Sequence, residues 1–125
     1  MMGALRLAPI ARIGAVVCLV LFALCLLLPG AYLQNYGVAP DPGGTFMVQR
    51  AAPMFLAVAA ILWVIAGAPQ SPLRGQILVC LALFFAGVAV TGVYHIATGQ
   101  AGPGLWAGVV AEVVATVLLI GLRNR

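Results

Sequence analysis

Glu112 is the residue whose type and position most directly predict chemistry in this chain. It lies in the hydrophobic stretch 108–116 and is the only acidic side chain inside any apolar segment. A carboxylate in hydrocarbon is costly unless it is protonated, paired or hydrated. We therefore expect the groups around Glu112 to shape the packing of the protein and to mark any functional site.

Four further polar side chains are candidates to act with Glu112. Gln49 and Arg50 stand near the start of one apolar segment, and Tyr94 and His95 stand near the end of another. At a helical rise of about 1.5 Å per residue, the ionisable groups of these segments lie about 5–10 Å below one membrane surface. The sequence thus predicts a polar cluster beneath the outer leaflet surface, made of Arg50, Tyr94, His95 and Glu112.

These candidates allow a structural and a chemical interpretation. Arg50 and Glu112 could form one buried ion pair, or Arg50 could extend to the lipid headgroups while Glu112 is protonated. In the chemical interpretation Glu112 donates or accepts a proton, with His95 or Tyr94 as the second acid–base group. Arg50 would then hold an anionic headgroup. Gln49 is either a further ligand of that headgroup or a capping residue.

The composition identifies the kind of protein that must position these groups. The chain has 125 residues, of which 65% are hydrophobic and 6% charged, whereas about 25% of the residues of a soluble domain are charged. Its positive charge comes from scattered arginines at the segment ends, so no basic groove can form and we expect no nucleic-acid binding. The chain is expected to be one integral membrane domain, residues 1–125.

Four apolar segments predict an all-α, four-transmembrane-helix bundle. Each is close to the roughly 20 residues that cross a hydrocarbon core of about 30 Å. The predicted spans are 13–31, 46–67, 74–98 and 105–122. We expect the linker 32–45 to be a loop at the interface, with Tyr32 and Tyr36 in an aromatic belt. The short connection 68–73 predicts that the second and third spans are antiparallel neighbours.

The arginines predict the orientation of an up-down-up-down bundle. Five of them fall on one side of the four spans: Arg6, Arg12, Arg74, Arg123 and Arg125. Basic residues concentrate on the cytoplasmic side, so both termini are expected inside (N-in/C-in), in the bacterial inner (plasma) membrane. We expect the first segment to be a retained helix, because its apolar run continues to Leu28 and Pro29-Gly30-Ala31 does not form a signal-peptidase site.

Two stripes of small residues predict which helix faces point into the bundle. Gly108, Glu112 and Thr116 recur at four-residue intervals. Gly87, Thr91 and His95 recur in the same way. Because small residues let membrane helices approach closely, both stripes are expected to face the interior. Pro53 either kinks the second span or begins it.

The sequence indicates no metal or cofactor. The cysteines Cys18, Cys25 and Cys80 are odd in number and lack the spacing of a zinc site. His95 is the only histidine, so bis-histidine ligation of a haem would need a second copy of the chain. Haem or quinone at His95 is retained only as an alternative, and no nucleotide-binding or hydrolase motif is present.

The layout resembles that of small uncharacterised bacterial four-helix integral membrane proteins. The resemblance is carried by Pro29-Gly30, residues 46–53, residues 92–99 and Ala111-Glu112, and it implies no particular activity. The Ala-Glu dipeptide in a short four-span chain is also similar to small multidrug resistance exporters. In those exporters the membrane glutamate belongs to the first helix, whereas the first segment here has no ionisable interior residue.

Three functions follow as hypotheses. The first is a non-enzymatic subunit or accessory factor of a membrane complex, or a homo-oligomer, because the chain is short and has no catalytic signature. The second is an enzyme for a lipid or isoprenoid substrate, with Glu112, His95 and Tyr94 as catalytic residues. The third is a proton-coupled dimeric transporter in which Glu112 exchanges protons for a cation. The expected partners are the lipid bilayer and a protein partner or a second copy.

Overall fold

The computed structural model describes residues 6–125, and every regular element in that range is a helix. The five helices are α1 (Leu7–Leu27), α2 (Pro29–Asn35), α3 (Pro42–Gly67), α4 (Pro72–Ala97) and α5 (Leu105–Leu122). All except the short α2 are long and apolar enough to cross a membrane. The protein is therefore an all-helical, multi-pass membrane protein.

The main difference from the sequence-based expectation lies in the linker, which is partly helical. Pro29 begins α2 and Pro42 begins α3, in each case in the first turn. There the fixed φ of proline suits a helix and its missing N–H is not needed. The Asp41 side chain caps α3 by accepting a hydrogen bond from the Gly44 backbone N–H. Because α3 begins before residue 46, Pro53 lies inside this helix.

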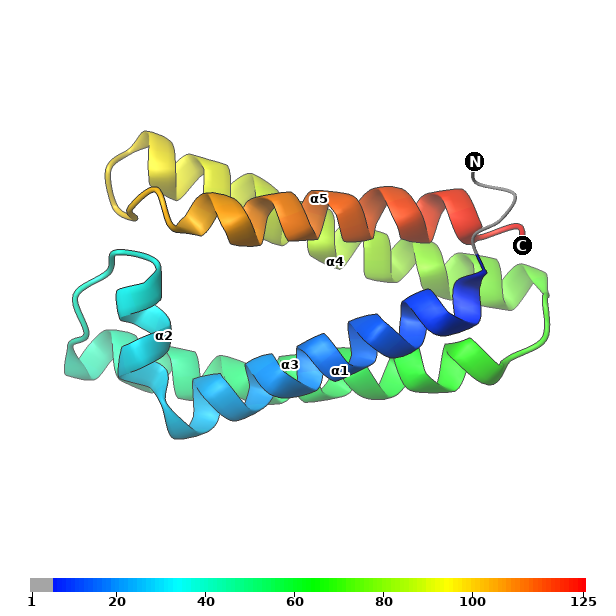
Figure 1. The fold of residues 1–125 in the computed structure, drawn as a ribbon, viewed down its shortest axis with the longest axis horizontal. Helices are drawn as coiled ribbons and strands as arrows, with labels where there is room; N and C mark the ends of the chain where they lie inside the picture. Colours follow the sequence, from blue (N-terminus) through cyan, green and yellow to red (C-terminus); the bar gives the residue numbers. More distant parts are fainter. Residues whose placement is uncertain (1–5) are drawn as a thin grey trace.

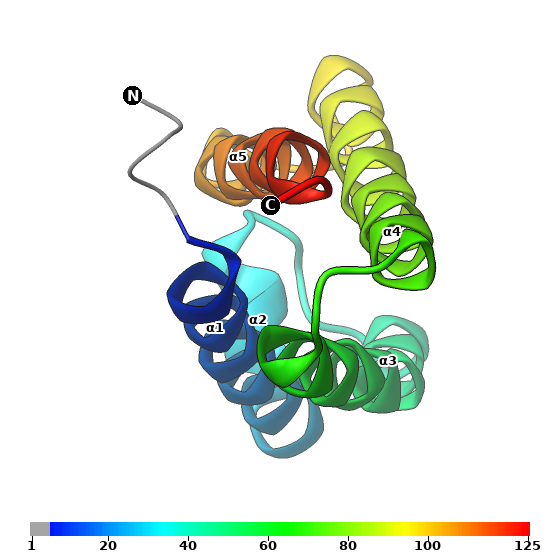
Figure 2. The same ribbon diagram turned by 90° about the vertical axis from the view of Figure 1, so that its right-hand side faces the viewer.

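The long helices form two hairpins. Helix α1 packs along α3 in the N-terminal hairpin, and α4 packs along α5 in the C-terminal hairpin (Figure 1). Both described ends of the chain lie at one end of the molecule, here called the terminal end, and α2 lies at the other, here called the α2 end (Figure 1). Viewed end-on, the four long helices occupy the corners of a bundle (Figure 2).

Helices α3 and α4 are not the close neighbours that their short connection predicts. They make little contact, whereas α1–α3 and α4–α5 are the extensive interfaces. Small residues explain this pairing. A Cβ atom on Gly92 of α4 would lie 2.8 Å from the Val109 side chain of α5, and one on Gly14 of α1 would lie 3.3 Å from Leu62 of α3. Interface composition therefore outweighs connection length.

The hydrophobic core lies in the half of the bundle nearer the terminal end, where all four long helices meet. Its buried members are Leu7, Ala11, Ala15 and Cys18 of α1, Val58, Ala59, Leu62 and Ile65 of α3, Leu78, Leu81 and Ala82 of α4, and Leu119 and Leu122 of α5. Towards the α2 end, the fully buried residues are few and mostly small: Cys25, Ala52, Ala89, Gly92 and Val109. The two hairpins are thus joined most firmly at the terminal end.

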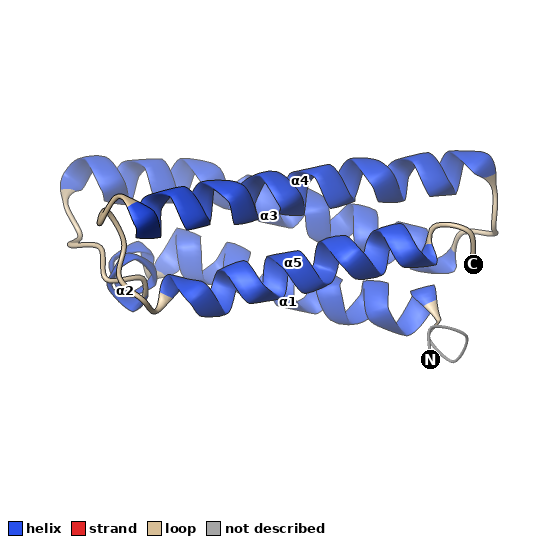
Figure 3. Ribbon diagram, turned by 90° about the horizontal axis from the view of Figure 1, so that it is seen from above, coloured by secondary structure: helices blue, strands red, loops and turns tan. Residues whose placement is uncertain are grey.

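A second junction between the hairpins closes the α2 end, where their loops meet backbone to backbone (Figure 3). The Gly102 N–H donates a 2.8 Å hydrogen bond to the Tyr36 carbonyl oxygen. Gly37 has a φ of 70°, and a Cβ atom there would lie 2.9 Å from the Gly102 backbone. A Cβ atom on Gly104 would lie 2.6 Å from the Asn35 carbonyl oxygen. Only glycine permits such close contact at these positions.

Candidate functional site

Glu112 lies on the face of α5 that looks towards α2. It is half-buried. Gly108 lies one turn earlier on the same face. A Cβ atom added to Gly108 would lie 3.5 Å from the Tyr36 hydroxyl oxygen. The Thr116 hydroxyl, one turn later, donates a 2.8 Å hydrogen bond to the Glu112 carbonyl oxygen. The stripe formed by Gly108, Glu112 and Thr116 therefore faces the inside of the protein, as its spacing predicts.

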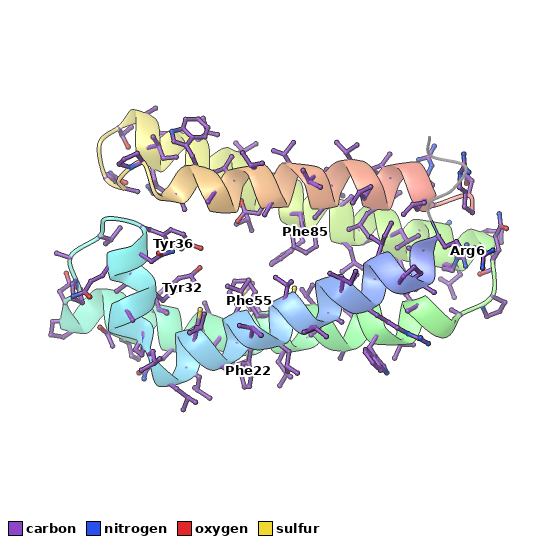
Figure 4. The ribbon with its side chains drawn as sticks, viewed as in Figure 1. Arg6, Phe22, Tyr32, Tyr36, Phe55 and Phe85 are labelled. Carbon is purple, nitrogen blue, oxygen red and sulfur yellow. The ribbon has the colours of Figure 1, made fainter. Side chains whose placement is uncertain are left out.

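Two tyrosines, Tyr32 within α2 and Tyr36 at its C-cap, form the other side of this site. The Tyr32 and Tyr36 rings are in edge-to-face contact, with centroids 5.0 Å apart. Both side chains extend from α2 into the region between the hairpins (Figure 4). Burial is the largest cause that raises the pKa of Tyr32, followed by the neighbouring Tyr36 and Cys25, and burial likewise raises the pKa of Tyr36. The Glu112 carboxylate lies near enough to raise both values further.

The local sequence explains why these tyrosines point inward. Pro29 fixes the start of α2, and a spacing of four residues places Tyr32 and Tyr36 on one face of the helix. The hydrogen bond from Gly102 to the Tyr36 carbonyl oxygen anchors the end of α2 to the α4–α5 turn. The ring of Tyr36 is thereby held over the first turns of α5, beside Glu112.

Aromatic side chains continue the site towards the middle of the bundle. Phe55 of α3 and Phe85 of α4 both project into the region between the hairpins (Figure 4). Both remain half-buried, although each lies on the interior face of its helix. We call Glu112, Tyr32, Tyr36, Phe55 and Phe85 the inter-hairpin site. The carboxyl group and the two phenols lie near the α2 end, and Phe55 and Phe85 lie nearer the middle, where Phe85 also packs against the hydrophobic core.

The structure does not bring Arg50 to Glu112. Arg50 is exposed, and its guanidinium carbon lies 5.9 Å from the centroid of the Phe46 ring. Since Ala52 is fully buried, a position two residues away lies on nearly the opposite face of α3. Among residues 6–125, no arginine is near enough to act on the Glu112 carboxyl group. The ion-pair interpretation is therefore wrong, and Arg50 points towards the surroundings of the bundle.

Tyr94 and His95 also lie outside the inter-hairpin site. Both are exposed near the end of α4, and their rings are 5.5 Å apart. The His95 Nδ1 atom makes a 2.5 Å hydrogen bond with the Gln100 side-chain oxygen. Both lie towards the α2 end of the bundle, as Glu112 does, but their side chains are on an outer face of α4. The stripe ending at His95 faces outward too, because Gly87 and Thr91 are exposed and Gly87 has no neighbour within 4 Å of its Cβ position.

Gln49 has a structural partner in the neighbouring helix. Its side-chain Nε2 atom donates a 3.2 Å hydrogen bond to the Leu26 carbonyl oxygen. Leu26 lies in the last turn of α1, where carbonyl groups have no partner within the helix. Gln49 thus caps α1 and ties it to α3, which corresponds to the capping alternative rather than to a headgroup ligand.

The described residues contain no group of three or more side chains able to hold a metal ion. All three cysteines are free thiols. Cys25 is buried and lies beside Tyr32, so it borders the inter-hairpin site. The chemistry available there is that of carboxyl, phenol and aromatic groups, which bind hydroxyl, carbonyl or amine groups and exchange protons with them.

Two features of functional interest escaped prediction from the sequence. Tyr32 and Tyr36 were expected at the membrane interface, although a proline followed by tyrosines four residues apart is a signal for a short helix with one aromatic face. Arg74 was counted only as an orientation signal, yet it is the only buried charged residue in the described part of the chain. Its position in the first turn of a helix, where a positive charge opposes the helix dipole, was the available sign.

Comparison of the chain with protein-family models, curated proteins and solved structures gives no match. A proposal for the function therefore depends on the geometry of the inter-hairpin site.

Proposed function

We propose that this protein is a non-enzymatic membrane binding protein that holds one amphiphilic small molecule in the inter-hairpin site. It acts as a subunit or accessory factor of a larger membrane complex, or as a homo-oligomer. The ligand has a hydroxyl, carbonyl or amine head and an apolar body. The head binds to Glu112 and the tyrosines, and the body lies against the phenylalanine rings.

The observation that carries this proposal is the setting of Glu112. A carboxyl group in a membrane-spanning helix normally has a cationic partner or a functional reason to be there. Here its neighbours are two phenol groups held by a dedicated short helix, and no arginine in residues 6–125 acts on it. Carboxyl and phenol groups together donate and accept hydrogen bonds, so they complement a small polar head.

The partly buried aromatic rings support an amphiphile rather than a small ion. Phe55 and Phe85 lie on interior faces and yet stay half-buried. Binding sites for small molecules are mostly apolar, with a few converging polar groups that fix orientation. An amine head would gain both the Glu112 charge and the faces of the tyrosine rings.

Mass spectrometry of the protein extracted in native lipid particles tests this proposal. The wild type is compared with Glu112→Leu and Tyr36→Phe, and with Arg50→Gln as a control that changes an exposed residue. We expect one compound of defined mass to be enriched with the wild type and with Arg50→Gln, and to be depleted in the other two variants. Equal recovery of every compound from all four proteins would contradict the proposal.

A second candidate function is acid–base catalysis on a lipid or isoprenoid. It is favoured by the closeness of the Tyr36 hydroxyl to the Glu112 face of α5. Glu112 and Tyr36 would be the proton-transferring pair, in place of the exposed His95 and Tyr94. Under this alternative the compound enriched by the wild type would differ chemically from the compound enriched by Glu112→Gln, because only the wild type would convert it.

We place the protein in the bacterial inner membrane with an up-down-up-down course and both termini in the cytoplasm. Five of the six arginines lie at the terminal end, whereas Asp41 lies at the α2 end. Basic residues favour the cytoplasmic side. The exposed Trp63 and Trp106 lie towards opposite ends of the bundle, as aromatic belt residues do. The inter-hairpin site then lies beneath the outer leaflet.

Assembly with a partner or a second copy is the remaining part of the proposal. Gly87 and Thr91 form an exposed small face on α4, and such faces favour close helix approach in membranes. Size determination after gentle solubilisation tests this part. A lone monomer with no co-purifying protein would count against it, without affecting the ligand-binding part.

A further inference from the structure

Arg74 is a buried cation at the terminal end, far from the inter-hairpin site. Only 8% of its surface is exposed. Its Nη1 atom donates a 3.1 Å hydrogen bond to the Ala68 carbonyl oxygen, while Nε and Nη2 are buried without a hydrogen-bond partner. A buried guanidinium with two unpaired nitrogen atoms is destabilising, because these donors have lost their hydrogen bonds to water, and a bound ligand that accepts from them would offset this loss.

The two unpaired atoms form one binding edge. In a guanidinium group the Nε–H and Nη2–H bonds point in the same direction, so together they make a planar fork. This fork matches two oxygen atoms of a carboxylate or a phosphate. Arg74 therefore holds a complete oxyanion-binding edge without a partner, while its third nitrogen atom is fixed to the α3–α4 connection.

No side chain of the protein can supply that oxyanion. Asp41 and Glu112 are the only acidic residues of the chain. Asp41 caps α3 at the α2 end, and Glu112 faces the tyrosines of α2. The terminal end is instead rich in arginine: Arg6, Arg12, Arg123 and Arg125 share it with Arg74.

The backbone around Arg74 also favours an anion. Arg74 lies in the first turn of α4, whose N-cap is Ser71, and its side chain reaches back past this cap to Ala68. The guanidinium group therefore lies at the N-terminal end of the helix, where the helix dipole attracts negative charge. An anion bound there interacts favourably with the dipole and also offsets the repulsion between the dipole and Arg74.

We propose that Arg74 is the ligand of a phosphate group that binds at the N-terminus of α4. A phospholipid headgroup is one source of this group, because basic sites between membrane helices near the bilayer surface bind anionic headgroups. Free phosphate is the other source, and the chemistry of recognition is the same. The site is independent of the inter-hairpin site and of its proposed ligand.

Thermal unfolding of the purified protein in a neutral detergent tests this proposal. Three additives are titrated in parallel: phosphatidylglycerol, diacylglycerol with the same acyl chains, and inorganic phosphate. Arg74→Gln is compared with Arg12→Gln, which removes an equal charge at the same end from an exposed side chain of α1 that lies over the Trp63 ring. Arg74→Lys keeps the charge but lacks the fork, and it serves if the glutamine variant does not fold.

We expect the unfolding temperature of the wild type and of Arg12→Gln to rise with phosphatidylglycerol and not with diacylglycerol. A rise with inorganic phosphate alone would identify free phosphate as the ligand. Arg74→Gln should lose the rise, and Arg74→Lys should need about tenfold more ligand for half of it. The proposal is wrong if neither phosphate source has an effect, if diacylglycerol acts equally, or if either Arg74 variant responds as the wild type does.

Discussion

At the scale of residues, Glu112 shows how a polar group in a membrane protein is accommodated without an opposite charge. The polar side chains nearest to it are the phenols of Tyr32 and Tyr36, which are uncharged and are able to hydrogen-bond to either protonation state of a carboxyl group. Arg50, the cation that the sequence offers as a partner, instead lies on the outer face of α3 over Phe46.

Glu112 and Arg50 should contribute independently to stability. We expect the double-mutant cycle of Glu112→Gln and Arg50→Gln to give a coupling energy within about 0.5 kcal/mol of zero. Removal of one partner of a buried ion pair would cost roughly 3–5 kcal/mol, most of it recovered in the double variant. Reversible unfolding in mixed micelles measures the four free energies. A coupling energy above about 2 kcal/mol would show that Arg50 and Glu112 do form an ion pair.

The tyrosines of α2 predict a loss of stability at high pH. Burial raises the pKa of Tyr32 and Tyr36 in the folded protein, whereas unfolded tyrosine ionises near pH 10. Above that pH the unfolded state binds fewer protons than the folded state, so the free energy of unfolding falls as pH rises. Below about pH 10 these tyrosines are protonated in both states, so they add no pH dependence to the free energy of unfolding.

The double variant Tyr32→Phe/Tyr36→Phe isolates this effect. We expect unfolding curves recorded between pH 8 and about pH 11 to fall less steeply for the variant, by up to about 1.4 kcal/mol per pH unit for each tyrosine. Parallel falls in the two proteins would show that these phenols ionise as freely in the folded state as in the unfolded state.

The sequence predicted which end of the bundle the polar residues approach, but not the direction in which their side chains point. Counting residues along a helix gives height, and Arg50, His95 and Glu112 do lie towards the α2 end. Direction depends on which face each helix buries, and this is set by contacts such as that of Gly92 with Val109. Only the stripe containing Glu112 was correctly placed on an interior face.

At the scale of elements, apolar length predicted that there are four long helices, but the bounds of the first were wrong: the predicted span was 13–31, whereas α1 is Leu7–Leu27. The predicted fourth span, 105–122, coincides with α5, and α4 begins and ends within two residues of the prediction. The element that was missed is α2, because seven residues are too few for a periodic hydrophobic pattern. Its signals were local: a proline in the first turn and two tyrosines at helical spacing.

The close packing of α4 on α5 depends on one glycine. Alanine at Gly92 would place its Cβ 2.8 Å from the Val109 side chain. A β-branched side chain adjusts poorly, so we expect Gly92→Ala to lower the free energy of unfolding by about 1–3 kcal/mol. Adding Val109→Ala should recover part of this loss.

Gly87, on the same helix, is the matched control. No atom lies within 4 Å of its Cβ position. Alanine favours a helix over glycine by up to about 1 kcal/mol, so Gly87→Ala should leave the protein as stable or stabilise it. Thermal unfolding of both variants measures the contrast, and equal effects would mean that the α4–α5 interface is looser than described.

At the scale of the whole molecule, two hairpins are joined at their ends and are less tightly packed between them. The apolar core joins them at the terminal end, and glycine backbone contacts join them at the α2 end. Between these junctions, the interior residues Tyr36, Phe55 and Glu112 remain half-buried. The short connection between α3 and α4 predicted that these two helices are neighbours. The length of a connection gives no information about which small residues pack against another helix.

The proposed site depends on the position of Tyr32 and Tyr36 inside the bundle, over α5. Solid-state NMR of the protein in lipid bilayers, with the tyrosine rings and the glycine Cα atoms labelled with ¹³C, tests it most directly. The Tyr36 hydroxyl oxygen lies 3.5 Å from the Cβ position of Gly108. We therefore expect a cross-peak between the Tyr36 ring and the Gly108 Cα atom. Contacts of the Tyr36 ring with lipid headgroups, and none with Gly108, would show that the tyrosines lie at the membrane surface and do not form a site with Glu112.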